Sequence, residues 1–189
     1  NRASVSWTTD PIVTKPFFPW LPGTGAGTMG IRRAVFEEAG GFDESLVTGE
    51  DVDLSWRVQL AGHRLVHHPE IVLHVRKRDG LRAVFRQAYA YGAGDRLLQH
   101  RYADVAAAFT TGAVTSGPGP ADPGPPVARA GALSVVRRVA RTVRNKLSRG
   151  RAGLAETVWR VGEQAGHRWG RVDPAASRVP VPAVLPPPV

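Results

Sequence analysis

The stretch TGEDVDLSWRVQLAGHRL, residues 48–65, carries the strongest fold signal in the chain, because it joins crowded carboxylates to an apolar-periodic segment. The three acids are Glu50, Asp51 and Asp53. Apolar side chains follow at helical spacing: Leu54, Val58 and Ala61. Because Gly62 is a typical helix end, the pattern predicts an amphipathic helix over residues 50–61 with acids in its first turn.

The acidic cluster has a structural and a functional explanation. In the structural one, Thr48 caps the helix and the acids lie where the positive end of the helix dipole favours them. Asp53 then pairs with Arg57 one turn later. In the functional one, a carboxylate faces a ligand. Local physics leaves both open, because short acidic motifs often occur by chance.

On the N-terminal side, prolines and glycines interrupt the chain. Residues 1–20 favour extended or loop structure, because their three prolines are incompatible with a helix interior. The glycine-rich sequence GTGAGTMG follows at residues 23–30. Residues 31–39 then have the apolar spacing of a short helix, and Gly40-Gly41 is its predicted end.

On the C-terminal side, residues 64–68 and 70–75 are two short strand candidates. Residues 80–102 favour a helix that Gly92 and Gly94 weaken. So few strands cannot form a self-sufficient α/β sheet. We therefore expect the second half of an α/β domain whose first half lies upstream.

The composition sets further bounds. The chain has 189 residues, of which 42% are hydrophobic, so a packed core is expected. Cysteine is absent, which excludes disulfides and thiolate metal sites. No run of about 18 apolar residues occurs, so no membrane-spanning helix is predicted. The first residue is Asn1 and the only methionine is Met29, which favours a piece of a longer protein.

Composition also divides the chain into four parts. They are a folded part at residues 1–108, a Gly/Pro-rich linker at 109–130, a basic amphipathic helical segment at 131–172 and a disordered Pro-rich tail at 173–189. The net charge of +9 is uneven. Residues 1–130 hold 14 Lys and Arg against 13 Asp and Glu, whereas residues 131–189 hold 11 against 3.

Several linked motifs occur in order between residues 18 and 102. They are Thr28-Met29-Gly30, Arg32-Arg33, Gly40 to Glu44, Gly49 to Arg57, and Ala61 to Arg64. Together they resemble the second half of the family 2 glycosyltransferases with a GT-A fold, although Asn is more usual in the family at the position of Thr28. The resemblance implies an α/β fold in which residues 1–108 form the C-terminal half of the catalytic domain.

The resemblance implies an enzyme that transfers a sugar with inversion from a nucleotide-diphosphate donor to an acceptor hydroxyl. One carboxylate must take the hydroxyl proton as the new bond forms. By its place in the family's Glu-Asp motif, that base is Asp51. Glu50 beside it would raise the proton affinity of the base or contact the acceptor. Asp53 and Arg57 are interpreted as structural partners that orient the loop.

A divalent cation, Mg²⁺ or Mn²⁺, is also implied, because the leaving diphosphate gains negative charge. In the family an Asp-x-Asp motif in the first half holds the metal, and no such motif precedes Thr48 here. The main ligands are therefore expected outside this chain, which alone should be inactive. In some family members a histidine after the last core strand joins the metal, and His74 has that position. A strand-end histidine that only hydrogen-bonds is the alternative.

Substrate contacts are expected at two places. The loop residues Gly27, Thr28 and Met29 would let the backbone approach the donor sugar or the acceptor. Arg76 and Arg78, with Lys77 between them, would neutralise the diphosphate. A solvated basic turn is the alternative for these three charges.

The basic tail suggests a surface partner. Valines and leucines recur at helical spacing over residues 132–149, with arginines between them, and Trp159 and Trp169 extend the pattern. One interpretation is docking on an anionic inner-leaflet membrane near a glycan or lipid-linked acceptor. The other is a helix that packs on the catalytic domain. Nucleic-acid binding is not expected, because no recognition module accompanies the charge.

These observations lead to two hypotheses about function. In the first, the chain is part of an inverting glycosyltransferase. This enzyme is expected in the cytoplasm, either free or attached peripherally to the inner face of the plasma membrane. The second is a non-catalytic module that binds membrane or polyanion, in which the acidic helix start is purely structural.

Overall fold

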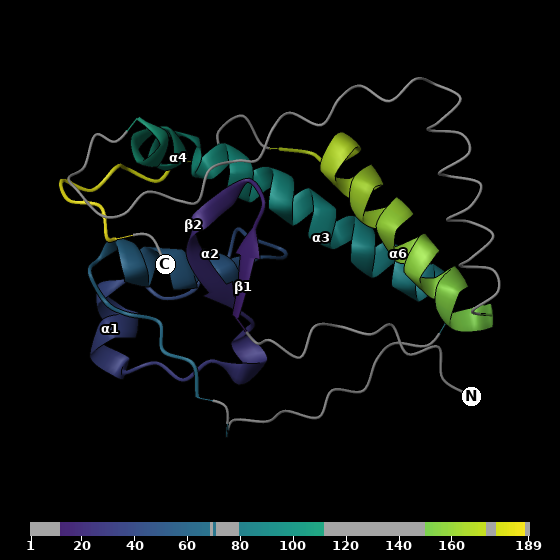
Figure 1. The fold of residues 1–189 in the computed structure, drawn as a ribbon, viewed down its shortest axis with the longest axis horizontal. Helices are drawn as coiled ribbons and strands as arrows, with labels where there is room; N and C mark the ends of the chain where they lie inside the picture. The colour runs from purple at the N-terminus through teal and green to yellow at the C-terminus, as the bar shows by residue number, and fades with distance from the viewer. Residues whose placement is uncertain (1–11, 69, 71–79, 112–149, 173–176, 188–189) are drawn as a thin grey trace.

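The computed structural model describes residues 12–68, 70, 80–111, 150–172 and 177–187 (Figure 1). These residues form a small α/β fold in which a two-stranded hairpin packs on helix α2, and a long helix, α3, runs beside α6. Within the described part of the chain, no helix is both long enough and apolar enough to cross a membrane.

The sheet is an antiparallel hairpin of β1 (Ile12–Lys15) and β2 (Phe18–Thr24). Ile12 pairs with Thr24 and Lys15 with Phe18, with an irregularity between Val13 and Lys15. Extended structure was predicted here, but strand pairing was not. Proline lacks the N–H that a sheet ladder needs, so a proline-rich segment resembles a loop in sequence. The hairpin leads into a single turn of 3-10 helix, η1 (Ala26–Thr28).

Two of the predicted helices are confirmed: α1 (Arg33–Glu38) and α2 (Glu50–Leu60). The glycines that end them have positive φ, +78° and +70° at Gly40-Gly41 and +92° at Gly62, a conformation that L side chains rarely adopt. The predicted cap at Thr48 is wrong. Gly49 occupies the cap position at φ +85°, and no side chain caps the helix.

Helix α3 (Leu81–Arg101) is confirmed and continues almost directly into α4 (Ala103–Thr110). The expectation that glycines weaken α3 is wrong, because the helix runs unbroken through Gly92 and Gly94. Both glycines are buried at close contacts. A Cβ on Gly92 would collide with the backbone at Glu163, and one on Gly94 would lie 2.8 Å from the carbonyl oxygen of Thr48.

Helix α6 (Gly150–Trp169) lies along α3 (Figure 1). Glycines again set the distance: a Cβ on Gly162 would lie 2.8 Å from the carbonyl oxygen of Phe85, and one on Gly166 would collide with that of Tyr89. Gly162 meets Phe85 and, one turn later on both helices, Gly166 meets Tyr89, so the two helices run parallel. The interpretation in which this part of the tail packs on the rest of the domain is therefore confirmed for α6.

The core is an aromatic cluster between β2, α2 and the end of α3. The rings of Phe18 and Trp56 are 4.5 Å apart, and those of Trp56 and Tyr102 are 4.8 Å apart in an edge-to-face arrangement. The indole N–H of Trp56 donates to the carbonyl oxygen of Leu21 at 2.8 Å, so the buried polar atom is satisfied. These contacts hold α2 against the hairpin.

The C-terminal segment 177–187 packs on this core, although residues 173–189 were expected to be disordered. Val179 and Leu185 belong to the core cluster, and the backbone N–H of Val179 donates to the carbonyl oxygen of Arg101 at 2.9 Å. The segment has no regular secondary structure, with a bend at residues 183–184.

Two other expectations differ from the structure. Residues 64–68, a strand candidate, have no regular secondary structure. The predicted linker begins later than residue 109, because α4 extends to Thr110 and the Phe109 ring stacks on Trp20 at 5.4 Å. The strand candidate at residues 70–75 lies outside the described residues except for Glu70, and so does the basic stretch 132–149.

Candidate active site

Helix α3 positions the acidic start of α2. The Thr48 hydroxyl donates to the carbonyl oxygen of Ala90 at 2.9 Å, and Gly94, one turn later, has no side chain that would displace it. Gly49 lies against Leu98, whose Cδ1 would be 2.9 Å from a Cβ at that position. Thr48 therefore anchors the loop to α3 instead of capping α2.

Asp51 is held by backbone amides at the edge of the glycine-rich loop. Its Oδ1 accepts from the N–H of Val52 at 2.8 Å, and its Oδ2 accepts from the N–H of Ala26 at 3.1 Å. The residue is half-buried, and no cation forms an ion pair with it among the described residues. Each carboxylate oxygen has more than one lone pair, so both can accept a further hydrogen bond.

Asp53, two residues later, is completely buried. Its Oδ2 accepts from Arg57 Nε at 2.7 Å, and its Oδ1 accepts from the Tyr102 hydroxyl at 2.9 Å. Arg57 in turn donates to the carbonyl oxygens of Ala39 and Gly41 at the end of α1. The sequence interpretation of Asp53 and Arg57 as partners that orient the loop is confirmed.

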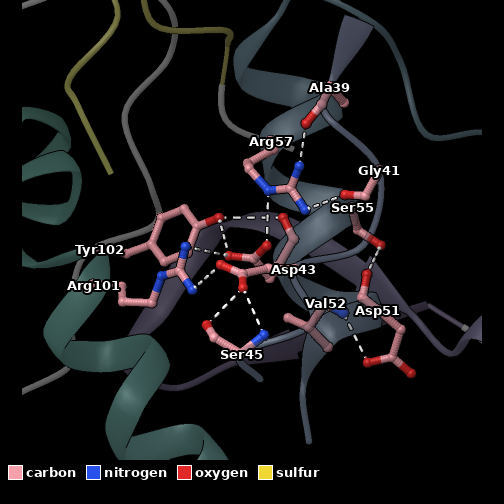
Figure 2. A network of polar contacts seen from close by, with 11 residues as sticks. Ala39, Gly41, Asp43, Ser45, Asp51, Val52, Ser55, Arg57, Arg101 and Tyr102 are labelled. Atoms are coloured by element: carbon pink, nitrogen blue, oxygen red, sulfur yellow. Dashed lines mark hydrogen bonds and ion pairs between the residues drawn. The ribbon is translucent and has the colours of Figure 1, made fainter. Parts of the chain in front are cut away.

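Figure 2 shows that Asp51 points away from the network around Arg57 and Tyr102. The two acids lie on opposite sides of α2 because residues two positions apart are about 200° apart around a helix. One carboxylate thus joins the hairpin loop and the other joins α3. The acids that look alike in the sequence have different environments.

A second ion pair links α3 to the turn before α2. Arg101 donates from Nη1 to Asp43 Oδ2 at 2.6 Å, and Ser45 donates to Asp43 Oδ1 through both its hydroxyl and its backbone N–H. The hydrogen bond from the Ser45 hydroxyl has the largest effect on the pKa of Asp43 and the bond from Arg101 the next largest. Together they lower this pKa to about 2. Burial, reinforced by the charge of Asp53, raises the pKa of Tyr102 far above its ordinary value, so this phenol stays protonated.

A cavity of about 340 Å³ opens beside α2. It lies between the loop after η1, helix α1 and residues 63–68, and it is lined by Met29, Ile31, Val35, Leu54, Ser55 and Val58 among others. Asp51 does not line it, but Ser55 does, and the Ser55 hydroxyl donates to the carbonyl oxygen of Asp51 at 2.7 Å. One lining residue, Ser55, thus lies one helical turn after Asp51.

The profile of glycosyl transferase family group 2 matches residues 4–149, which include this whole arrangement. The chain belongs to that family. The resemblance seen in the sequence motifs is therefore confirmed. The small two-stranded sheet with its helices is a mixed α/β arrangement compatible with a glycosyltransferase domain.

Two similar proteins are both named pre-mycofactocin glycosyltransferase, from Mycobacterium tuberculosis strains CDC 1551 / Oshkosh and ATCC 25618 / H37Rv. Each is 37% identical over 76 residues. The match covers 40% of this chain but 16% of the length of each relative. No solved structure matches the chain significantly.

The remaining site candidates of this family 2 chain fall in different places. Glu50 is half-buried at the first turn of α2 beside Asp51. Gly27 and Thr28 lie in η1, where the Thr28 hydroxyl donates to the carbonyl oxygen of Gly25, and Met29 lines the cavity. The loop and the acids are thus brought together, since Ala26 contacts Asp51.

The basic and metal candidates lie outside the described residues: His74, Arg76, Lys77 and Arg78. In the part of the chain that the structure describes, no three His, Asp or Glu side chains cluster as metal ligands would. The described residues therefore do not by themselves fit a divalent cation.

Sequence reasoning missed the contribution of α3 to this candidate site. Thr48, Gly94, Arg101 and Tyr102 all take part, yet their partners are about 40 to 60 residues away in the sequence. One signal was present in the sequence. Gly94 lies inside a segment that otherwise favours a helix, and a glycine inside a helix often marks a place where another part of the chain approaches the backbone closely.

Proposed function

We propose that this chain forms part of an inverting glycosyltransferase, which transfers a sugar from a nucleotide-diphosphate donor to an acceptor hydroxyl with Asp51 as the general base. Family membership supports the reaction class. Within the described part of the chain, two backbone amides and no cation hold Asp51 at the glycine-rich loop, and this observation carries its assignment as the base. Such a carboxylate is oriented and still able to accept a proton.

In the proposed step, the acceptor hydroxyl attacks the anomeric carbon of the donor sugar. Asp51 takes the hydroxyl proton as the new C–O bond forms, and the bond to the nucleoside diphosphate breaks on the opposite face. The anomeric configuration inverts because a single displacement occurs. Glu50, half-buried beside the base, would support its proton affinity or contact the acceptor.

Donor contacts are proposed for the loop at Gly27, Thr28 and Met29, whose backbone is close to Asp51 through Ala26. Arg76 and Arg78 remain candidates for binding the diphosphate. The acceptor is proposed to be a glycan or lipid-linked alcohol, and the location is proposed to be the cytoplasm.

A divalent cation, Mg²⁺ or Mn²⁺, remains a proposal as well. When bound, such an ion would neutralise the leaving diphosphate. His74 is the candidate ligand in this chain, and the other ligands would have to come from residues that the structure does not describe or that lie outside this sequence.

The experiment compares Asp51→Asn and Asp51→Glu with wild type in the full-length protein that contains this chain. Release of UDP or GDP from a panel of nucleotide-sugars is measured, and NMR determines the anomeric configuration of the product. Glu44→Gln is the matched control, since it also converts a carboxylate to an amide, at an exposed position before the same helix.

Asp51→Asn should lower kcat by at least about 100-fold because the proton has no acceptor, while Glu44→Gln should have little effect. Thermal unfolding should show that both variants keep their fold. Normal turnover by Asp51→Asn would remove Asp51 from the mechanism. A product of retained configuration would exclude single displacement.

A further inference from the structure

The outer surface of the α3–α6 pair has an unusual composition. Over residues 81–101 and 153–169, the exposed side chains include four arginines and no aspartate or glutamate. The arginines are Arg82, Arg86, Arg160 and Arg168. The acids of the two helices, Asp95, Glu156 and Glu163, are half-buried, and Asp95 pairs with Lys15 at 2.7 Å. The exposed surface of this pair is therefore cationic.

Large apolar side chains share this surface. Val161 is 53% exposed and Trp169 is 67% exposed, and Leu154 and Phe85 are also exposed. Leu154, Val161 and Arg168 are seven residues apart, so they align along one stripe of α6. The Arg168 guanidinium lies over the Trp169 ring, 6.0 Å from its centroid. The stripe thus carries two apolar side chains, Leu154 and Val161, and one cation, Arg168.

Helix geometry places arginines of α3 beside that stripe. Trp159 and Tyr91 meet edge to face on one flank of the pair, with ring centroids 5.5 Å apart. At 100° per residue, the stripe of Val161 lies on the opposite flank of α6, and Arg86 lies on the opposite flank of α3. We name this surface the basic–apolar face: Arg82, Arg86, Leu154, Val161, Arg168 and Trp169.

The basic–apolar face is rigid, because backbone contacts hold the two helices together. The buried glycines of α6 leave no space for a side chain between the helices. Arg96 donates to the carbonyl oxygen of Arg168 and secures the end of α6. A surface fixed in this way needs little ordering when it binds a partner.

We propose that the basic–apolar face docks on an anionic lipid bilayer, with arginines at the phosphates and Val161, Leu154 and Trp169 inserted among the upper acyl chains. A bilayer surface combines negative charge with apolar depth, and the face combines the complementary groups. A nucleic acid would satisfy the charge but would leave the aliphatic side chains without a partner. The proposal does not depend on the role of Asp51.

The test is co-sedimentation of the full-length protein with vesicles of phosphatidylcholine, with and without phosphatidylglycerol. Arg86 and Arg168 belong to the face and are exposed, so Arg86→Gln/Arg168→Gln removes two of its charges. Arg33→Gln/Arg178→Gln is the matched control, because it removes two charges from ion pairs elsewhere. Val161→Ser tests the apolar contribution at an exposed position.

Wild type should bind only the phosphatidylglycerol vesicles. Because each arginine near an anionic surface contributes a factor of about five, the face variant should bind about 25-fold more weakly. The control pair should bind like wild type, and Val161→Ser should weaken binding with an unchanged melting temperature.

Three results would overturn the proposal: equal binding to pure phosphatidylcholine, an equal loss in the control pair, or a face variant that binds vesicles normally but loses binding to a DNA duplex. A blue shift of tryptophan emission on adding anionic vesicles should disappear in Trp169→Phe. A shift that persists unchanged would place the contact elsewhere.

Discussion

Asp51 and Asp53 are chemically identical and only two positions apart in the sequence, yet their surroundings differ completely. Asp53 is buried and bonded to Arg57 and Tyr102, whereas the described residues bond to Asp51 through backbone amides at the rim of a loop. Both oxygens of Asp53 are already bonded within the fold, to Arg57 and to Tyr102, so this side chain does not face a ligand. The difference in environment favours Asp51 as the reactive group.

Asp53→Asn should destabilise the domain by about 3 kcal/mol, because it leaves the Arg57 guanidinium partly buried without its counter-charge. Asp104→Asn is the matched control, since Asp104 also pairs with an arginine but is 54% exposed, and it should cost less than about 0.5 kcal/mol. Urea unfolding of both variants measures the difference. Equal effects would show that burial does not set the strength of the Asp53 pair.

Acid should weaken the fold through Asp43. Its pKa is about 2 in the folded state against 3.8 ordinarily, so its contribution is complete above about pH 4 and is lost as the pH falls through about 2. The contribution is at most about 2 kcal/mol. Asp43→Asn should flatten this part of the profile of unfolding free energy against pH.

Ser45→Ala should move the same transition to higher pH, because the Ser45 hydroxyl makes the largest contribution to lowering the pKa of Asp43. An unchanged transition in both variants would mean that another acid governs the acid sensitivity.

Among the elements, α3 connects the others. One face of α3 holds Thr48 and Gly49 at the start of α2, and another face holds α6. A glycine at each contact allows the backbones to approach closely. In the sequence alone, the same glycines indicate a weak helix. Helix propensity is a local quantity, and here tertiary packing outweighs it.

Gly166→Ala tests this packing. In an exposed helix the change would stabilise by about 1 kcal/mol, but here the new Cβ would collide with the carbonyl oxygen of Tyr89. We expect a net loss of roughly 2 kcal/mol, measured by thermal unfolding. Gln164→Ala, at an exposed position of the same helix, should be nearly neutral. Stabilisation by Gly166→Ala would contradict close packing of α6 on α3.

At the scale of the whole molecule, a distant segment completes the core. Residues 177–187 return from the C-terminal end of the chain and bury Val179 and Leu185 against the aromatic cluster of β2 and α2. A proline-rich composition predicts an extended chain, but it does not reveal which apolar side chains will find a hydrophobic surface.

Leu185→Ala should destabilise the fold by about 2 kcal/mol, because the side chain is 5% exposed and its loss leaves a cavity. Val184→Ala, one residue earlier and 70% exposed, should change the free energy of unfolding by less than about 0.5 kcal/mol. Urea unfolding compares the two. Equal effects would show that the segment does not pack on the core in solution.

The amino-acid sequence alone determined the helices of the central region, their glycine ends and the family, because these depend on periodicity and on linked motifs along a continuous stretch. The tertiary structure alone decided the different roles of Asp51 and Asp53, the anchoring of Thr48 on α3 and the burial of Leu185. Each of these depends on a partner far away in the chain. Burial and ion pairing determine the role of a carboxylate more than its residue type does. Neither burial nor ion pairing can be read from neighbouring residues in the sequence.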